Sequence, residues 1–258
     1  MSHPAYGVLR PVSPIASVLL QNNPSTMTLE GTNTWVLQAP GVAGRIVVDP
    51  GYALDEHLDV LSGLAGIELI VLTHRHPDHV EAAPVLAERV GAPVRAFDAS
   101  LCREGDPLGD GDVVRAAGLT LRVTHTPGHT DDSIVLRVDH DDRVHVLTGD
   151  TVLGRGTTVL SDLGDYLDSL RILCALPPNT LGLPGHGPEL SDLTSTVTEY
   201  LRHREQRLDQ VRRALRELGD DATARQVVEL VYADVDRALW GPAEASVQAQ
   251  LEYLRSRG

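Results

Sequence analysis

The 258-residue chain carries 22 basic residues, all Arg, against 36 acidic residues, for a formal net charge of −14. This surplus excludes a broad basic surface for nucleic acid. Its 42% apolar content can fill the core of one large domain, or of a moderate domain with an appendage. No apolar run reaches bilayer length and residues 1–10 do not resemble a secretory leader, so we expect a cytoplasmic protein without membrane contact. Cys102 and Cys174 form no CxxC pair and predict no disulfide framework or thiolate zinc site.

Short β-branched runs separated by Gly and Pro dominate the first 190 residues. They predict strands over residues 15–20, 34–38, 45–49, 69–72, 119–124, 133–138 and 144–147. Helical periodicity predicts helices over residues 54–64, 77–90 and 165–175. Helices between some of the strands favour an α/β (α+β) fold of two sheets covered by outer helices, a four-layer αββα sandwich, over a single doubly wound sheet.

The pattern changes after residue 190, where apolar residues recur at helical spacing. Three helices are predicted over residues 193–218, 223–231 and 242–255. The second begins at Thr223 with Gln226 three residues later, the spacing of a capping box. The sequence therefore predicts a main domain over residues 1–190 and a small winged-helix-like helical subdomain over residues 191–258.

Four candidate metal ligands follow the predicted strand 69–72 directly: His74, His76, Asp78 and His79, in the order HxHxDH. Side chains crowded this closely repel one another on protonation and lose solvation when buried bare. A divalent cation that neutralises and orders them is the economical explanation. The alternative, a solvated His-rich turn, is disfavoured by the spacing.

Three later loops at strand ends each supply one more candidate, namely His129, Asp150 and His186. His129 and His186 follow Pro-Gly pairs, which bend the chain sharply. Asp49 also ends a predicted strand, where it either supports a ligand loop or forms a plain turn before Pro-Gly. The other histidines are assigned no metal role: His3, His57, His125, His140, His145 and His203.

The ordered motifs HxHxDH, GH, GD and PGHG resemble the metallo-β-lactamase fold superfamily over about the first 190 residues. The resemblance implies one metal held by His74, His76 and His129, a second held by Asp78, His79 and His186, and Asp150 as the bridge. It implies two Zn²⁺ ions per chain. Mn²⁺ and Fe²⁺ stay open, because His and Asp ligands accept all three metals.

Two metal ions about 3.5 to 4 Å apart lower the pKa of a shared water and polarise a carbonyl or phosphoryl oxygen. The expected activity is therefore hydrolysis of an ester-type bond by a metal-bridging hydroxide. Asp78 is the candidate catalytic residue, because it can orient the attacking water or relay a proton. By resemblance, a bridging carboxylate such as Asp150 is typical of thioesterase and nuclease branches, whereas many zinc β-lactamases have Cys there.

Within the superfamily the chain is most similar to the β-lactamase-like protein 2 group, through residues 28–35, 149–159 and 200–207 and the C-terminal helices. That group includes endoribonucleases directed at single strands, and sibling branches cleave thioesters. The resemblance implies a metal-dependent hydrolase acting on a small molecule or on single-stranded RNA. Endoribonuclease-like cleavage is one expectation and a thioesterase of the glyoxalase II or acyl-thioester type is the alternative; a β-lactamase or a non-catalytic nucleic-acid-binding module is disfavoured.

Charged residues near the predicted site help to decide between RNA and a thioester as the substrate. The candidates to meet an anionic substrate are Arg155, Arg202, Arg204 and Arg207, unless they form an ordinary solvated face. The cluster continues with Val80-Glu81-Ala82-Ala83, where relatives commonly have a small residue and glycines. Either Glu81 opposes phosphate at the site entrance, or, as we favour, it begins a helix and complements its dipole. The C-terminal subdomain is expected to shape the substrate entrance or a homodimer contact.

Overall fold

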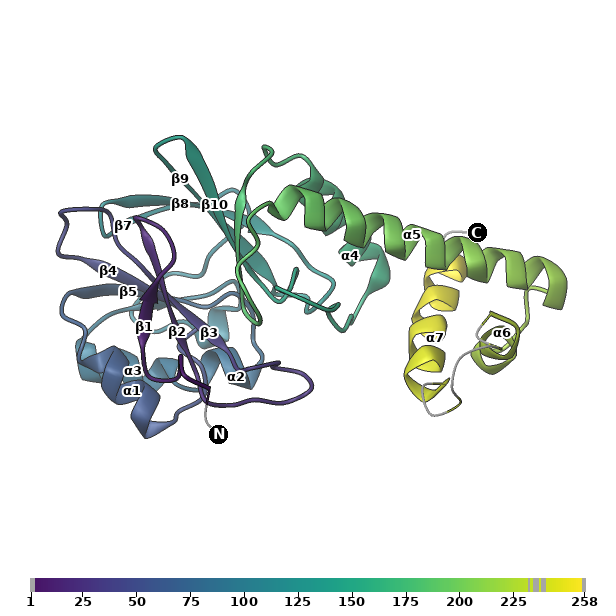
Figure 1. Cartoon of the computed structure of the whole chain (residues 1–258), viewed down its shortest axis with the longest axis horizontal. Coiled ribbons are helices and arrows are strands. Elements are labelled where there is room, and N and C mark those ends of the chain that lie inside the picture. Colours follow the sequence, from purple (N-terminus) through teal and green to yellow (C-terminus); the bar gives the residue numbers. More distant parts are fainter. Residues whose placement is uncertain (1–2, 232, 234–236, 238–239, 257–258) are drawn as a thin grey trace.

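The computed structural model describes residues 3–231, 233, 237 and 240–256, whose strands form two sheets (Figure 1). The first sheet has the order β1-β2-β3-β4-β5-β6, with β4, β5 and β6 parallel and the other neighbours antiparallel. Its strands are β1 (Leu9–Pro11), β2 (Ala16–Leu20), β3 (Asn33–Leu37), β4 (Arg45–Val48), β5 (Ile67–Val71) and β6 (Val94–Arg95).

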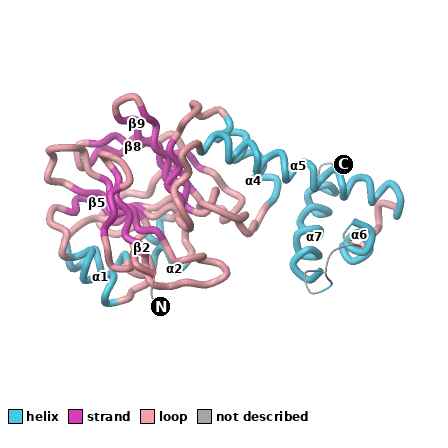
Figure 2. Tube along the Cα trace, in the orientation of Figure 1, coloured by secondary structure: helices cyan, strands magenta, loops and turns pink. Residues whose placement is uncertain are grey.

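The second sheet has the order β11-β10-β9-β8-β7, and only its β10–β11 pair is parallel. Its strands are β7 (Val113–Ala116), β8 (Leu119–His125), β9 (Ile134–His140), β10 (Arg143–Gly149) and β11 (Leu181–Pro184). Loops at one end of these strands, pink in Figure 2, carry three of the predicted ligands, His129, Asp150 and His186.

Alternating side chains place the main core between the two sheets. In β4, Ile46 and Val48 belong to that core, whereas Val47 packs under helices α1 (Asp55–Ser62) and α3 (Ala83–Val90). In β10, Leu147 points inward and Val146 packs under α4 (Leu163–Cys174). The resulting order of helix, sheet, sheet and helix confirms the predicted αββα sandwich.

All seven predicted strands are present, and four short strands were not predicted: β1, β6, β7 and β11. Each of the four lies at the edge of its sheet. An edge strand pairs with one neighbour only, and strands of two to four residues are too short to show a repeating pattern. Their absence from the sequence prediction follows from their length.

The predicted helix over residues 77–90 is wrong in one respect, because the chain forms two helices there, α2 (Pro77–Val80) and α3. Pro84 has no N–H to continue the bonding of a single helix, and its ring would clash with the preceding turn. Ala82 N instead donates a hydrogen bond of 2.8 Å to Gly51 O. The break lets α2 end close to the loop that follows β4.

The C-terminal part is helical, as predicted, and consists of α5 (Leu193–Leu218), α6 (Ala224–Val231) and α7 (Trp240–Ser256). The first turns of α5 pack beside α4, and its far end shares a separate small core with α6 and α7 (Figure 1). The capping box forms, with Thr223 N donating to Gln226 Oε1 at 2.9 Å. Because α5 contributes to both cores, the division at residues 190 and 191 stays a prediction. Within the described residues, no helix combines the length and apolar composition needed to cross a bilayer.

Candidate metal centre

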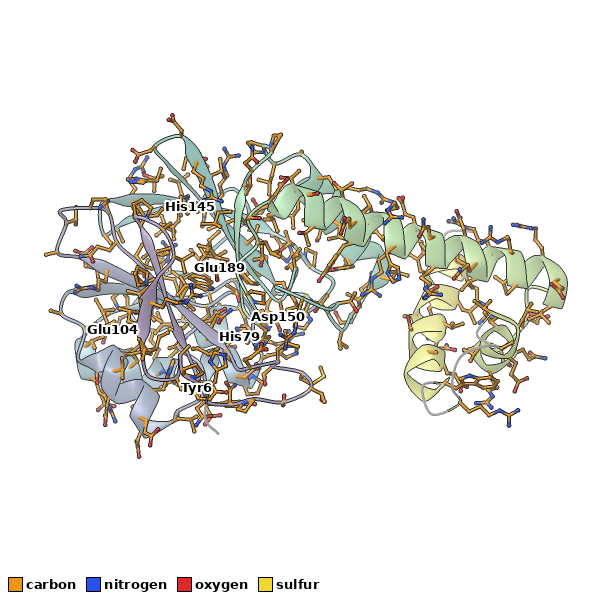
Figure 3. The ribbon with its side chains drawn as sticks, in the orientation of Figure 1. Tyr6, His79, Glu104, His145, Asp150 and Glu189 are labelled. Atoms are coloured by element: carbon orange, nitrogen blue, oxygen red, sulfur yellow. The ribbon has the colours of Figure 1, made fainter. Side chains whose placement is uncertain are left out.

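The seven predicted ligands come together at one end of the sandwich. The segment after β5 and the start of α2 supplies the first cluster, and the ends of β8, β10 and β11 supply the others. Figure 3 shows His79 and Asp150 side by side there, while His145 lies at the other end of β10. The cluster consists of His74, His76, Asp78, His79, His129, Asp150 and His186.

Three imidazoles form one half of the cluster, here called the imidazole triad: His74, His76 and His129. His76 Nδ1 lies 3.1 Å from His74 Nε2 and 2.9 Å from His129 Nε2. Three ring nitrogens at these separations match the donor set of a zinc ion.

Two imidazoles and a carboxylate form the other half, here called the carboxylate triad: Asp78, His79 and His186. His186 Nε2 lies 3.2 Å from both His79 Nε2 and Asp78 Oδ2. The two triads use different elements, so distant parts of the chain must fold together to complete either one.

Asp150 lies between the two triads. Its Oδ2 is 3.3 Å from His186 Nε2 and 3.7 Å from His129 Nε2. Its Oδ1 is buried and has no hydrogen-bond partner in the described part of the chain. A buried carboxylate oxygen without a donor is costly, so the residues fit a bound cation near Asp150.

The electrostatics of the cluster agree with that fit. Burial, together with the neighbouring imidazoles, lowers the pKa of His74 and His76 and keeps them neutral, the form that binds metal. Burial also opposes a proton on His186, but the Asp150 carboxylate and the hydrogen bonds to Asp150 and Asp78 outweigh it and raise the pKa to about 10. The carboxylate side of the site therefore favours positive charge.

The ring nitrogens that face away from the cluster also have hydrogen-bonding partners. His79 Nδ1 lies 2.9 Å from Asp49 Oδ2, and His186 Nδ1 lies 3.1 Å from Gly31 O. His129 Nδ1 lies 2.7 Å from Val159 O and 2.9 Å from Thr158 Oγ1. Such partners fix the ring orientation of a metal ligand.

Asp49 positions the ligand loop rather than merely forming a turn. Its carboxylate is buried and accepts hydrogen bonds from Thr73 N at 2.8 Å and Thr73 Oγ1 at 2.6 Å, besides its contact with His79. Asp49 could also form a metal-sized group with His74 and His79. Its oxygens are already occupied by these donors, so we assign it a positioning role.

Glycine is required where the chain passes closest to the ligands. A Cβ on Gly185 would lie 2.5 Å from Asp150 Oδ1 and 2.7 Å from His79 Cε1. Gly128, with a φ of +128°, lies so close to α4 that a Cβ would meet the Tyr166 backbone at 2.5 Å. The Pro-Gly-His pattern thus reflects tight packing as well as chain bending.

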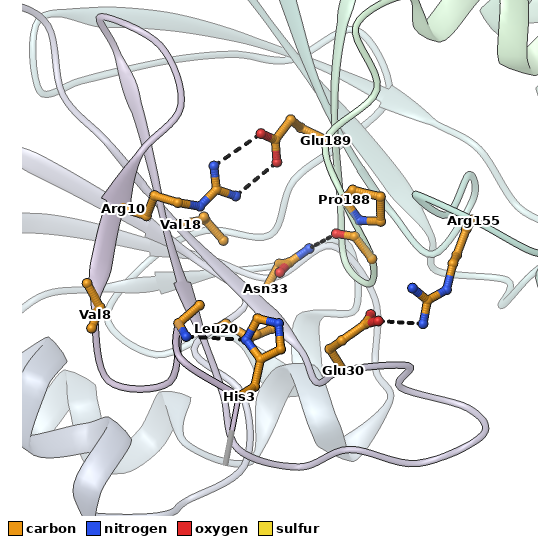
Figure 4. A pocket seen from close by; sticks show the side chains of 12 residues that line it. His3, Val8, Arg10, Val18, Leu20, Glu30, Asn33, Arg155, Pro188 and Glu189 are labelled. Carbon is orange, nitrogen blue, oxygen red and sulfur yellow. Dashed lines mark hydrogen bonds and ion pairs between the residues drawn. The ribbon is translucent and has the colours of Figure 1, made fainter. Parts of the chain in front are cut away.

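The predicted basic residues are dispersed. Arg155 forms an ion pair with Glu30 in a cavity of about 380 Å³ beside the His186 loop (Figure 4). Arg207 donates to Gln210, Arg202 is exposed on α5, and Arg204 lines a different cavity. They therefore do not form one anion-binding patch at the metal centre.

The favoured interpretation of Glu81 is wrong. Glu81 ends α2, and the first turn of α3 contains no acidic residue. Burial and then the carboxylates of Asp78 and Glu81 raise the pKa of the Tyr52 hydroxyl, so Glu81 adds negative charge on the Asp78 side of the site.

The remaining histidines lie outside the two triads. His57 contacts Thr34, His125 stacks on Phe97, His140 faces Asp141, and His145 is buried. His3 and His203 are exposed.

Sequence reasoning missed two supports of the ligands. Thr73 directly precedes the HxHxDH cluster, and this position next to a candidate ligand could have indicated a supporting role. Thr158 lies 29 residues from His129 in a loop with no recognisable motif, so only the folded chain reveals its contact.

Comparison with known proteins agrees with this geometry. Residues 27–186 match the metallo-beta-lactamase superfamily, and residues 223–258 match the beta-lactamase associated winged helix domain. A Drosophila melanogaster beta-lactamase-like protein 2 homolog is 32% identical, with 93% of this chain and 87% of that protein covered. An atrochrysone carboxyl ACP thioesterase from Aspergillus fumigatus is 31% identical, with 95% and 80% covered.

The fold is also that of a solved protein. The crystal structure of a beta-lactamase domain protein from Burkholderia ambifaria superposes with a TM-score of 0.80 at 24% identity, covering 99% of this chain and 90% of that one. The chain therefore belongs to the metallo-β-lactamase superfamily, as a hydrolase with a candidate His/Asp metal site and a C-terminal winged-helix domain.

Proposed function

We propose that the chain is a dinuclear zinc hydrolase whose substrate is an acyl thioester. The observation that carries the dinuclear part is the place of Asp150, whose Oδ2 lies 3.3 Å from an imidazole of one triad and 3.7 Å from an imidazole of the other. Five imidazoles and two carboxylates favour zinc among the divalent ions these ligands accept.

The chain's own residues supply orientation and proton transfer. Bound cations would supply an activated water and polarise the substrate carbonyl. Asp78 is the most exposed carboxylate of the cluster, at 14%, and Thr32 Oγ1 donates a hydrogen bond of 3.4 Å to its Oδ2. Burial alone would favour its protonated form, but His186 and His79 lower its pKa. Asp78 is thus ionised at neutral pH and can accept a proton from the attacking water.

The thioester assignment draws on the relative from Aspergillus fumigatus, which is named an atrochrysone carboxyl ACP thioesterase. Charge supports it over RNA, because Asp78 and Glu81 make the Tyr52 side of the site negative and Arg155 is paired with Glu30. The sugar–phosphate backbone of RNA would meet repulsion there, whereas an uncharged thioester carbonyl would not.

A turnover panel on zinc-loaded protein tests this proposal. It compares an acyl-pantetheine thioester, single-stranded RNA and a chromogenic lactam. We expect hydrolysis of the thioester, abolished in His129→Ala and Asp78→Ala and retained in His140→Ala, which removes a histidine outside the cluster. Cleavage of RNA in place of the thioester would overturn the substrate assignment, and full activity after metal removal would overturn the mechanism.

A further inference from the structure

A single loop, residues 151–162, runs past ligands of both triads. It forms neither helix nor strand, begins directly after Asp150 and ends where α4 begins. Within it, Gly154 N donates a hydrogen bond of 2.9 Å to His186 O. This segment, here called the connecting loop, is therefore attached to the carboxylate between the triads and to the backbone of a ligand in the carboxylate triad.

The far part of the connecting loop sets the orientation of the His129 ring. His129 Nε2 faces the cluster, 2.9 Å from His76 Nδ1, and must be unprotonated to bind a cation, so the ring proton lies on Nδ1. Nδ1 then donates to Val159 O at 2.7 Å, with Thr158 Oγ1 at 2.9 Å. Because the two acceptors belong to consecutive residues, a shift of the backbone there turns the imidazole.

Helix α5 holds that part of the connecting loop from the outside. Arg204 Nη2 donates to Thr158 O at 3.1 Å, and one turn earlier the Tyr200 hydroxyl donates to Gly156 O. Arg204 and Tyr200 are four residues apart and thus lie on the same face of the helix. The Arg204 guanidinium also lies 5.6 Å from the centre of the Tyr166 ring, a cation–π contact that restricts its position.

We propose that Arg204 is a positioning residue for the imidazole triad. By holding the Thr158 carbonyl, it places the two oxygen atoms that aim His129 at the bound cation. The first helix of the C-terminal part thus completes the metal centre through the connecting loop. The inference rests on the proposed dinuclear zinc function and names a residue, far from the cluster in the sequence, on which that function depends.

The carboxylate triad is held by other parts of the chain. His79 Nδ1 contacts Asp49 Oδ2, and His186 Nδ1 contacts Gly31 O. Neither partner belongs to the connecting loop. Loss of the Arg204 donors should therefore weaken zinc binding at the imidazole triad alone, whereas a general loss of stability would weaken both triads.

Zinc titrations of the full chain against a chromogenic chelator test this inference without any turnover. Arg204→Met removes the donors and keeps the apolar stem of the side chain. In a His186→Ala background, where the imidazole triad is intact, it should raise the zinc Kd about tenfold. In a His129→Ala background it should leave the Kd unchanged, because the ring that Arg204 positions is gone.

Three further variants separate positioning from folding. Arg204→Lys keeps a charged donor for Thr158 O and should raise the Kd no more than about threefold. Arg202→Met changes an exposed residue on the same helix and should have no effect. Val211→Ala loosens the small core that α5 shares with α6 and α7, so it should lower Tm and leave the Kd unchanged.

A spectroscopic readout reports the geometry directly. With one Co²⁺ bound in the His186→Ala background, Arg204→Met should shift the visible absorption of the metal, and Val211→Ala should not. If Arg204→Met fails to fold, Arg204→Gln decides the question, because its amide is too short to reach Thr158 O.

The outcomes distinguish this inference from the function on which it rests. Equal Kd values and equal spectra with and without the Arg204 substitution, or an equal loss in Val211→Ala, would overturn the inference and leave the proposed function intact. A wild type that binds no zinc would overturn both. Thioester turnover by the zinc-loaded wild type is measured separately, and its absence would contradict the proposed substrate alone.

Discussion

The two triads of the metal cluster lie side by side but differ in charge. In the imidazole triad, burial and neighbouring rings lower the pKa of His74 and His76, so the metal meets neutral ligands. In the carboxylate triad, Asp150 and Asp49 raise the pKa of His79 against the effect of burial. The carboxylate triad thus offers a negative site that attracts any divalent ion. Metal binding at the uncharged imidazole triad depends instead on the preference of the metal for nitrogen ligands and on the nearby charge of Asp150.

Removing the shared carboxylate should have the largest effect, because it weakens both triads. We expect Asp150→Asn to lower kcat/KM about a thousandfold or more, the several kcal/mol that metal activation contributes. Zinc per chain, measured by mass spectrometry of the metal, should fall below two. An Asp150→Asn protein that retains two zinc ions would contradict the bridging role.

Removing one imidazole from each triad should expose the difference between them. His129→Ala leaves the carboxylate triad intact, and we expect it to retain one ion and to accept Mn²⁺ nearly as well as Zn²⁺. His186→Ala leaves three imidazoles, and its remaining site should prefer Zn²⁺ strongly. Competitive metal titrations measure this, with His140→Ala as control; identical selectivity in the two variants would contradict the comparison.

Weakening a support of the carboxylate triad should have a smaller effect. Asp49→Asn removes the charge that contacts His79 Nδ1, and we expect zinc affinity to fall about 10- to 100-fold. Asp141→Asn is a matched control, because Asp141 shares the left-handed backbone of Asp49, with φ of 48° and 53°, but lies outside the cluster. Equal zinc affinities for the two variants would refute the positioning role.

His57, a buried histidine outside both triads, is expected to make the unfolding free energy depend on pH without affecting metal binding. Burial lowers the pKa of His57 from 6.5 to about 4, so the unfolded chain takes up a proton first as the pH falls. The stability tied to neutral His57 is present above pH 6.5 and is lost between pH 6.5 and 4, on the order of 3 kcal/mol. His57→Gln should therefore reduce the acid dependence of the unfolding free energy, measured by urea titration, and leave zinc content unchanged. An unaltered pH dependence would count against the buried neutral state.

The residues that gather at one end of the sandwich could be picked out from the sequence, because each candidate ligand segment directly follows an apolar strand. That they bind metal stays a prediction. His129, Asp150 and His186 all lie where a strand of the second sheet ends, and strand ends meet at one edge of the sandwich. The pairing of distant ligands came from family resemblance, because spacing along the chain does not determine which loops meet. The helix break at Pro84 could have been predicted from the sequence, because proline cannot continue a helix.

Contacts that depend on packing between distant segments could not be predicted. Asp49 allowed two interpretations until its carboxylate was seen to accept hydrogen bonds from Thr73 and contact His79. A cavity of about 420 Å³, lined by Thr158 on one side and by Gln250 of α7 on the other, forms only because α7 faces the loop around Thr158. Glutamine on an amphipathic helix gives no sign that its side-chain oxygen will be buried without a partner in the described part of the chain.

The most direct measurement is an anomalous diffraction map of zinc-loaded crystals. We expect two zinc peaks about 3.5 to 4 Å apart, one among His74, His76 and His129 and the other among Asp78, His79 and His186. Asp150 Oδ2 should lie between the two peaks. A single peak, or a peak coordinated by Asp49 with His74 and His79, would contradict the dinuclear centre.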